Sequence, residues 1–234
     1  MASVNSKKKA TPANDTPAND SAGSGAIKLP EVDFRVALVT VKGISPLIVH
    51  AWSEKAKGMM RDKQQKQARV AKEAKNPEAD YLASKYLDSK GRDCVPAAGF
   101  RNAMISAGRF SEGVPMTIIR GSIFVLADAE GLIPIEAHEC RMREDMVRVG
   151  GKGPGTGVAD LRYRAEYNPW QCRLKIQYNA NSLSLAQVLN LTRLAGMSVG
   201  LCEWRPEKNG QYGRFDISGG VEELRGDAAM KAVA

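Results

Sequence analysis

The pattern of apolar and polar residues predicts alternating strands and helices once the chain has passed about residue 30. Residues 34–41 form a β-branched run that is apolar on both faces, as expected of a central strand that is covered on both sides. Residues 128–131 predict a hairpin turn between two further strands. The other strands are predicted over residues 46–50, 116–127, 133–143, 161–167, 172–178 and 212–217.

Four segments have the composition or the periodicity of helices. The first runs from Ser53, a predicted N-cap, to about Lys75, and it has many basic residues but few large apolar ones. We expect this helix to be poorly anchored to a core, with its basic face covered by solvent, by nucleic acid or by a neighbouring subunit. The remaining helices are predicted over residues 79–87, 97–109 and 183–197.

The order of these elements predicts the fold class. Without its insertions, the chain reads β-α-β-β-α-β, which is the ferredoxin-like arrangement that RNA-recognition domains also use. We therefore expect an α+β protein whose antiparallel sheet has helices on one face and a free face for binding. The predicted organisation is a disordered tail over residues 1–30, a single RRM-like domain over 31–225 with a basic helical insertion at about 53–92, and a flexible C-terminus over 226–234.

Basic residues line the polar faces of two strands between residues 161 and 178. Arg162 and Arg164 alternate with apolar and aromatic residues in the first strand, and Arg173 and Lys175 do so in the second. If these two strands pair with each other, their hairpin displays four cations on one face. Such a surface is better suited to binding a polyanion than to catalysis.

A glycine-rich loop at residues 150–157 precedes this predicted hairpin and contributes Lys152 as a fifth cation. The loop does not match a Walker motif, because Met146 stands where the first glycine belongs and Gly153 follows the lysine. A G-x-G-x-x-G match that starts at Gly151 meets Thr156 in place of its last glycine. We therefore predict no nucleotide cofactor here, but a loop that closes on a ligand strand or that only connects two strands.

Residues 199–215 combine aromatic and basic side chains. Trp204 and Tyr212 could stack on bases while Arg205 and Arg214 reach phosphates, a mixture that single-strand binders use. Trp204 could equally pack over the end of the preceding helix. Both interpretations stay open at this point.

Composition narrows the class of partner. The chain has 234 residues, a net charge of +8 and a pI near 9.3, which favours nucleic acid or another anionic surface. No apolar run approaches the roughly 20 residues that a membrane span needs. The four cysteines form no C-x-x-C pair, so we expect reduced thiols in a cytoplasm-like compartment and no metal site.

No catalytic motif stands out. His50 and His138 could in principle act as an acid and base pair on a phosphodiester, but nothing in the sequence brings them together. No Ser-His-Asp order and no pair of carboxylates at catalytic spacing is present. We therefore predict a protein without enzymatic activity and without a cofactor.

Several short motifs together resemble the RAMP superfamily of CRISPR effector proteins, and within it the backbone subunit that polymerises along guide RNA. They are Gly-Ile-Ser-Pro-Leu-Ile at 43–48, Val-Pro-Ala-Ala-Gly-Phe-Arg-Asn-Ala-Met at 95–104, the glycine-rich loop and Gly-Arg-Phe at 213–215. The resemblance implies a modified RNA-recognition fold with helical insertions, in which repeated subunits hold single-stranded RNA mainly by its phosphates. It also implies that Arg101, near a helix N-terminus, contacts a phosphate and that the loop at 150–157 touches the strand. A phage-type or plasmid-type single-strand-binding protein of related fold fits the same motifs. Either resemblance implies a cytoplasmic protein of a bacterial or phage-infected cell.

The predicted function is sequence-independent binding of single-stranded DNA or RNA by a protein that oligomerises along the strand. The alternatives are a structural assembly protein of a virus particle and a RAMP-type endoribonuclease that uses His50 or His138. The predicted nucleic-acid-binding residues are Arg101, Lys152, Arg162, Arg164, Arg173, Lys175, Trp204, Arg205, Tyr212 and Arg214.

Overall fold

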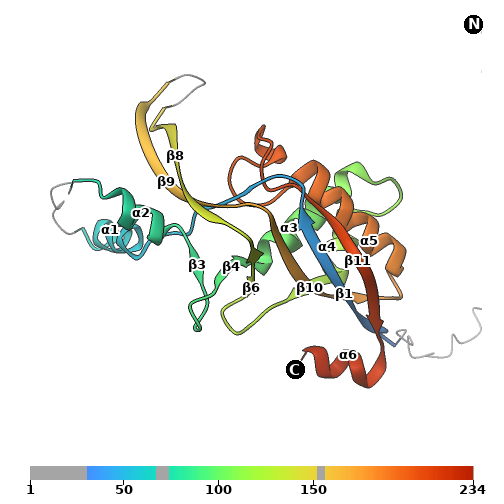
Figure 1. Ribbon diagram of the computed structural model, residues 1–234. Helices are drawn as coiled ribbons and strands as arrows, with labels where there is room; N and C mark the ends of the chain where they lie inside the picture. The colour runs from blue at the N-terminus through green and yellow to red at the C-terminus, as the bar shows by residue number, and fades with distance from the viewer. Residues whose placement is uncertain (1–30, 67–73, 152–155, 234) are drawn as a thin grey trace, which may run out of the picture. The chain divides into compact units, whose positions relative to one another are not determined.

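A computed structural model describes residues 31–66, 74–151 and 156–233 of the chain (Figure 1). The tail predicted over residues 1–30 and Lys152 lie outside these ranges. Residues Val32–Ala234 form one compact unit.

The central sheet has the strand order expected of a ferredoxin-like fold. Its four main strands are β1 (Phe34–Gly43), β5 (Ile123–Leu126), β10 (Trp170–Asn179) and β11 (Phe215–Leu224). They lie in the order β11-β1-β10-β5, which is 4-1-3-2 in chain order, and each neighbouring pair is antiparallel. The short strand β7 (Glu136–Ala137) also pairs with β10. The predicted α+β fold with an antiparallel sheet is confirmed.

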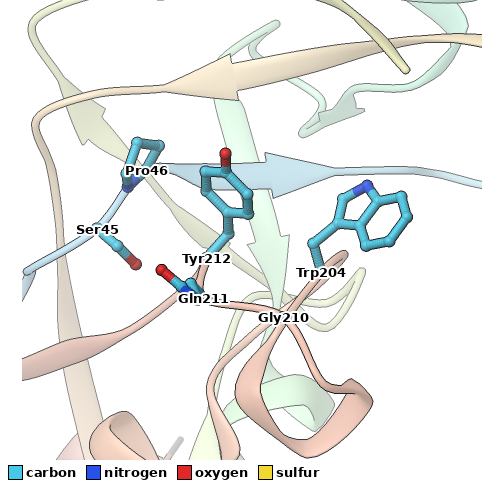
Figure 2. Close-up of a pocket in the computed structure, with 6 residues that line it drawn as sticks. All are labelled: Ser45, Pro46, Trp204, Gly210, Gln211 and Tyr212. Carbon is cyan, nitrogen blue, oxygen red and sulfur yellow. The ribbon is translucent and has the colours of Figure 1, made fainter. Parts of the chain in front are cut away.

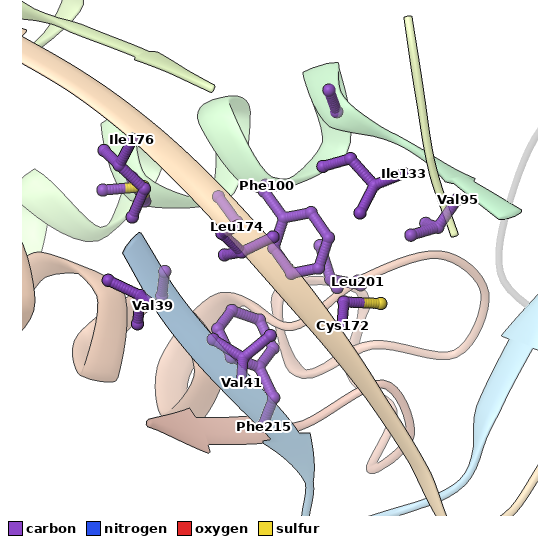
Figure 3. Close-up of a cluster of buried hydrophobic side chains, with 14 of the residues drawn as sticks. Val39, Val41, Val95, Phe100, Ile133, Cys172, Leu174, Ile176, Leu201 and Phe215 are labelled. Atoms are coloured by element: carbon purple, nitrogen blue, oxygen red, sulfur yellow. The ribbon is translucent and has the colours of Figure 1, made fainter. Parts of the chain in front are cut away.

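Helices cover one face of this sheet. They are α3 (Ala97–Ala107), α4 (Met116–Ser122), α5 (Leu185–Leu194) and the π-helical turn η2 (Ala195–Val199). The apolar stripe predicted for α3 is buried, and the Phe100 ring meets the Phe215 ring edge-on, with centroids 5.5 Å apart. Figure 3 shows this core, in which Val39 and Val41 of β1 and Leu174 and Ile176 of β10 lie beneath the helices. The alternation predicted for β10 is confirmed. The prediction that β1 is covered on both faces is only partly correct, because Val39 and Val41 are buried beneath the helices while Leu38 and Thr40 on the other face are partly exposed.

The opposite face of the sheet carries polar side chains at its centre. Because directly paired residues share a face, Arg173 lies beside Thr40, and Lys175 lies beside Leu38, on the side away from the helices. Helix α6 (Gly226–Val233) packs against β1 and buries Ala229. This helix forms where the sequence predicted only a flexible C-terminus.

Two smaller sheets adjoin the central one. The first has the order β2-β9-β8, built from β2 (Leu47–Val49), β8 (Cys140–Val149) and β9 (Val158–Tyr167). We call the β8–β9 hairpin, which extends away from the central sheet in Figure 1, the arm. The second has the order β3-β4-β6, built from β3 (Tyr86–Leu87), β4 (Asp93–Pro96) and β6 (Leu132–Pro134).

The helical insertion consists of α1 (Glu54–Gln64) and α2 (Pro77–Ala83). Ser53 is the N-cap of α1, as predicted, and its hydroxyl accepts a hydrogen bond from the backbone nitrogen of Ala56 at 3.2 Å. Neither helix has a buried residue, and α2 packs against β9 of the arm. The weak anchoring predicted for the helix that starts after Ser53, from its shortage of large apolar residues, is thus observed for α1.

The predicted pairing of strands 161–167 and 172–178 is wrong. β9 instead pairs with β8 and β2, while β10 pairs with β1, β5 and β7. Between them the backbone nitrogen of Asn168 donates to the carbonyl of Glu139, and that of His138 donates to the carbonyl of Pro169. These bonds direct the chain from one sheet into the other. Alternation shows which face of a strand is buried but not which strand lies beside it.

Two other predicted strands are only partly correct. Residues 116–122 form helix α4, because Ile119 and Ser122 are buried one helical turn apart and Gly108 leaves room for the Ile119 side chain. Residues 133–143 divide among β6, β7 and β8. The turn at 128–131 does form, with Gly131 donating to the carbonyl of Asp128 at 3.0 Å, but the strands on either side join different sheets.

Replacing Gly196 with alanine tests the packing of η2 against β11. A Cβ at this position would lie 1.9 Å from the carbonyl oxygen of Phe215, so the backbone of one element must move. We expect Gly196→Ala to lower the free energy of unfolding by about 2 to 3 kcal/mol in urea titrations. Gly58→Ala is the control, because a Cβ in α1 meets nothing within 4 Å, and this variant should be as stable as the wild type or more so. Equal stability of the two variants would contradict the close packing.

Candidate nucleic-acid interface

A surface pocket lies between the β1–β2 turn and the loop at residues 200–214, which we call the aromatic loop. The pocket has a volume of about 370 Å³. Figure 2 shows the residues that line it, which are Ser45, Pro46, Trp204, Gly210, Gln211 and Tyr212. The Trp204 side chain is 39% exposed. The two aromatic residues singled out in the sequence therefore line one pocket.

The backbone of the aromatic loop holds Trp204 in an unusual conformation. Trp204 has a φ of 53°, in the left-handed region that residues with a Cβ rarely adopt. The backbone nitrogen of Tyr212 donates to the carbonyl of Trp204 at 3.0 Å, and a Cβ on Gly210 would lie 1.7 Å from that oxygen. The Gly213 nitrogen donates to the carbonyl of Pro46 at 2.8 Å, which attaches the loop to the β1–β2 turn. Strain of this kind persists only where the surrounding structure holds it, and it is common at ligand sites.

One face of the arm carries four arginines, and we call it the arginine face. The β8–β9 register places Arg143 directly opposite Arg164, with Arg141 and Arg162 on neighbouring rungs of the same face. Glu166, whose side chain is 1% exposed, receives the Arg141 guanidinium at 2.5 Å and that of Arg143 at 2.7 Å. Buried carboxylates thus position these guanidinium groups while neutralising part of their charge.

Arg143 joins the arginine face to the pocket. Its guanidinium carbon lies 4.7 Å from the centre of the Tyr212 ring, which is a cation–π distance. Partial burial lowers the pKa of Arg143, but hydrogen bonds to Glu166, Asp145 and Tyr212 outweigh this effect and raise it. The side chain therefore stays charged beside an aromatic surface, an arrangement suited to a base and its phosphate.

Arg164 is buried rather than exposed, so the prediction that it projects into solvent is wrong. Its side chain is 6% exposed and lies 3.4 Å from Asp145 and 3.7 Å from Glu203 of the aromatic loop. The Glu203 carboxylate also lies 3.7 Å from Nδ1 of His50. Alternation correctly predicted which face of β9 carries Arg164, but the aromatic loop covers that face where Arg164 lies.

The other arginines predicted near this surface have internal partners. Arg162 forms an ion pair with Asp160 at 2.9 Å, and its side chain is 38% exposed. Arg205 donates to the carbonyl of Cys202 at 3.0 Å and pairs with Glu207 at 3.2 Å. The partly exposed Arg214 follows Tyr212 by two residues, and its backbone nitrogen donates to the Ser45 hydroxyl. Their roles in binding stay predictions.

Arg101 serves as a link between elements. Its Nε donates to the carbonyl of Ile123 at 2.9 Å, one Nη donates to that of Arg120 at 2.7 Å, and the guanidinium lies 4.9 Å from the Phe124 ring. These bonds attach α3 to α4 and β5. Part of the Arg101 guanidinium is thus occupied by hydrogen bonds within the protein, and the predicted phosphate contact stays a prediction.

Arg173 and Lys175 lie apart from the pocket in the fold, on the face of the central sheet away from α3 and α5. The Arg173 side chain is 77% exposed and pairs with Glu136 at 3.1 Å, while Lys175 is exposed. Among the described residues, no hydrogen bond or ion pair joins these two side chains to the arginine face. The four basic residues that the sequence predicted on one hairpin therefore lie on two separate surfaces.

The sequence prediction missed Arg141 and Arg143. Both stand at alternate positions of β8, and this alternation was the signal that could have identified them. Ser45, Pro46 and Gln211 could not have been found in this way, because the pocket brings together segments more than 150 residues apart in the chain.

No metal or membrane site is found within the residues that the structure describes. No group of three or more His, Cys, Asp or Glu side chains there is placed to hold a metal ion. None of the helices described is long and apolar enough to cross a membrane.

The strand order and the helix layer define a ferredoxin-like α+β fold, and one solved structure shares this fold. No protein-family model and no curated protein matches the chain. It is similar to a chain in the cryo-EM structure of the Type III-B Cmr-beta bound to cognate target RNA, with a TM-score of 0.53, 9% identity, and coverage of 82% of this chain and 61% of that one. The crystal structure of Cmr6 from Pyrococcus furiosus matches with a TM-score of 0.42 and 13% identity over 79% of this chain and 99% of that one. At 9% identity the first likeness shows the fold alone.

The Glu203 carboxylate should make stability depend on pH. The neighbouring His50 imidazole, 3.7 Å away, lowers the pKa of Glu203, burial opposes this effect, and attraction to Arg164 lowers the pKa further. Because the folded-state pKa lies below the usual 4.5, the carboxylate stabilises the fold above that pH and loses this effect as the pH falls through the folded pKa. We expect Glu203→Gln to be less stable than the wild type at pH 7, with the difference shrinking below about pH 4.5 in urea titrations. The exposed Glu222→Gln should show no such trend, and an unchanged difference at low pH would contradict the role of Glu203.

Proposed function

We propose that this protein binds single-stranded nucleic acid without sequence preference and assembles as repeated copies along the strand. The observation that carries the proposal is the junction of the arginine face with the aromatic pocket, where Arg143 stacks against Tyr212. A single strand offers phosphates and unstacked bases side by side. A row of guanidinium groups next to exposed aromatic rings matches both features.

The arginine face supplies the phosphate contacts. Arg141 is 63% exposed, so its guanidinium can contact a phosphate while it keeps its bond to Glu166. Arg143 holds its position through Glu166 and Asp145, which lowers the entropy lost on binding. Arg162 and Arg214 extend the basic surface on either side, and Lys152 of the glycine-rich loop is assigned a closing contact.

Trp204 and Tyr212 supply a platform for bases. Stacking tolerates any base, because each one has a π-face, and this accounts for binding without sequence preference. The Type III-B Cmr-beta assembly, one chain of which shares this fold with a TM-score of 0.53, is bound to cognate target RNA, and this supports nucleic acid as the ligand class here. RNA and DNA are both retained as ligands.

The proposal includes no catalytic step. His50 lies beside the pocket and pairs with Glu203, whereas the backbone of His138 bonds to Pro169 in the turn before β10. No hydrogen bond or ion pair among the described residues joins the two imidazoles. A cleavage assay with His50→Ala tests the endoribonuclease alternative directly, since products that disappear with this change would support it.

The binding affinity should fall as the salt concentration rises, and the slope of this fall should report how many arginines contact phosphates. We expect fluorescence anisotropy to show tighter binding to single-stranded RNA or DNA than to duplex DNA, and light scattering to show particles that grow with strand length. Arg141→Gln should reduce the magnitude of the slope of log K against log salt by about 0.7, because one phosphate contact is lost. Arg173→Gln measures in the same way whether the sheet face away from α3 and α5 also contacts the strand.

Lys231→Gln is the matched control for Arg141→Gln, because Lys231 is exposed on α6 and belongs to neither basic surface. Its salt slope should equal that of the wild type. Identical losses in the two variants would show a general charge effect and contradict a contact at the arginine face. Absence of binding together with assembly of the protein alone would favour the structural alternative.

The stacking platform gives a separate prediction. Trp204→Ala should weaken binding to single strands by about 1–3 kcal/mol, the usual effect of removing a base–aromatic stack, while Trp204→Phe should retain most of the affinity. Trp52→Ala is the control, because Trp52 is 61% exposed and lies outside the pocket. Equal affinity of the Trp204→Ala variant and the wild type would show that Trp204 only packs over the preceding helix end.

A further inference from the structure

A cluster of polar side chains lies where the arm joins the helical insertion and the small sheet. It consists of Tyr81 of α2, Lys85, Asp93 of β4, Cys140 of β8 and Tyr167 of β9. The Tyr81 hydroxyl lies 3.5 Å from Sγ of Cys140, and Nζ of Lys85 lies 3.4 Å from Asp93 and 5.1 Å from the Tyr81 ring centre. Neither the arginine face nor the aromatic pocket includes any of these residues.

The hydroxyl of Tyr167 faces this cluster without a hydrogen-bond partner in the part of the chain that the structure describes. Tyr167 is 1% exposed, and the β8–β9 register places it directly opposite Cys140 on the same face of the arm. Burial raises the pKa of Tyr167, and the nearby Asp93 carboxylate and Cys140 sulfur raise it further, so the hydroxyl keeps its proton. Asp93 and Cys140 are the acceptors nearest to this buried hydroxyl, but neither forms a hydrogen bond of ordinary geometry with it, so an oxygen added at the sulfur would provide a better-placed acceptor.

Lys85 supplies a positive charge next to the sulfur. Partial burial lowers the pKa of Lys85, but attraction to Cys140 and Asp93 outweighs this effect and raises it, so the amine stays an ammonium. A thiolate at Cys140 would thus face the hydroxyls of Tyr81 and Tyr167 and one ammonium, part of whose charge is offset by the Asp93 carboxylate 3.4 Å from it. Cationic and hydrogen-bonding neighbours of this kind stabilise the nucleophilic form of cysteine.

The other three cysteines provide a contrast within the same chain. Cys94 and Cys172 are fully buried, and burial raises the pKa of Cys94 to about 11 and that of Cys172 further still. Burial also raises the pKa of Cys202 to about 12, although its residue surface is partly exposed, as that of Cys140 is. These thiols are therefore expected to be inert at neutral pH.

We propose that Cys140 is a reactive thiol and a site of oxidation by small hydroperoxides. The thiolate attacks the distal oxygen of the hydroperoxide, an S–O bond forms and the O–O bond breaks. The sulfur is oxidised by two electrons to a sulfenic acid, and the hydroperoxide is reduced to an alcohol, or to water for hydrogen peroxide, which leaves with the proton that the thiol gave up. The new sulfenic oxygen provides an acceptor for the Tyr167 hydroxyl.

The position of Cys140 gives the modification a structural consequence. Cys140 is the first residue of β8, and its sulfur contacts Tyr81 of α2, which packs against β9. An added oxygen occupies space between the insertion and the base of the arm. The site itself does not depend on the nucleic-acid proposal, since no step of its chemistry involves a bound strand.

Rates of reaction at each cysteine of the full-length protein test the proposal. Limiting iodoacetamide, followed by peptide mass spectrometry, should label Cys140 at least tenfold faster than Cys94, Cys172 or Cys202. Hydrogen peroxide with dimedone as a trap should give the sulfenic-acid adduct at Cys140 alone. Comparable rates at Cys140 and Cys202 would overturn the proposal, because both residues are partly exposed and only the surroundings of Cys140 include an ammonium and two phenols.

Variants of Lys85 separate activation from simple exposure. Lys85→Met should slow the labelling of Cys140 about tenfold at neutral pH and move its pH–rate profile to higher pH, whereas Lys85→Arg, which keeps the charge, should retain most of the rate. Lys90→Met, in the nearby exposed turn, is the control and should not change the profile. If circular dichroism shows that Lys85→Met is unfolded, Tyr81→Phe tests the same donor set. An unchanged profile in folded Lys85→Met protein would refute the activation of Cys140.

Discussion

Strand β10 is the constraint on which the rest of the structure depends. It pairs with β1 along nine residues, with β5 along four and with β7 along two, so it fixes the relative positions of three segments that are far apart in the chain. Its apolar face, with Leu174 and Ile176, lies in the core beneath the helices, and its polar face carries Arg173 and Lys175. Because side chains alternate strictly along a strand, burying the first set exposes the second.

A second constraint operates in the arm, where arginines and carboxylates alternate across β8 and β9. Glu166 is almost completely buried and receives two guanidinium groups, and Asp145 contacts Arg143 and Arg164. A carboxylate in such a place is stable only when it is paired. The same pairing holds the arginines in a fixed row, at the expense of part of the positive charge that a polyanion would meet.

The sequence predicted the central elements well and the partners of the strands poorly. The runs that became β1, β10 and α3, and the Ser53 cap of α1, were read from local patterns that the structure contains. The predicted basic hairpin failed because β9 and β10 belong to different sheets. Of the candidate site, Trp204 and Tyr212 were identified from composition, but Ser45 and Arg143 reach the pocket or its edge only through tertiary contacts.

The sequence by itself determined which face of β10 is apolar, where α1, α3 and α5 begin, and the β-α-β-β-α-β order of a ferredoxin-like fold. These features depend on residues a few positions apart, whose interactions are local. Only the tertiary structure decided that Arg164 is buried against Glu203, that Arg173 and Lys175 occupy another surface, and that Cys140 lies among Tyr81, Lys85 and Tyr167. Each of these outcomes depends on contacts between segments distant in the chain, and no local periodicity contains that information.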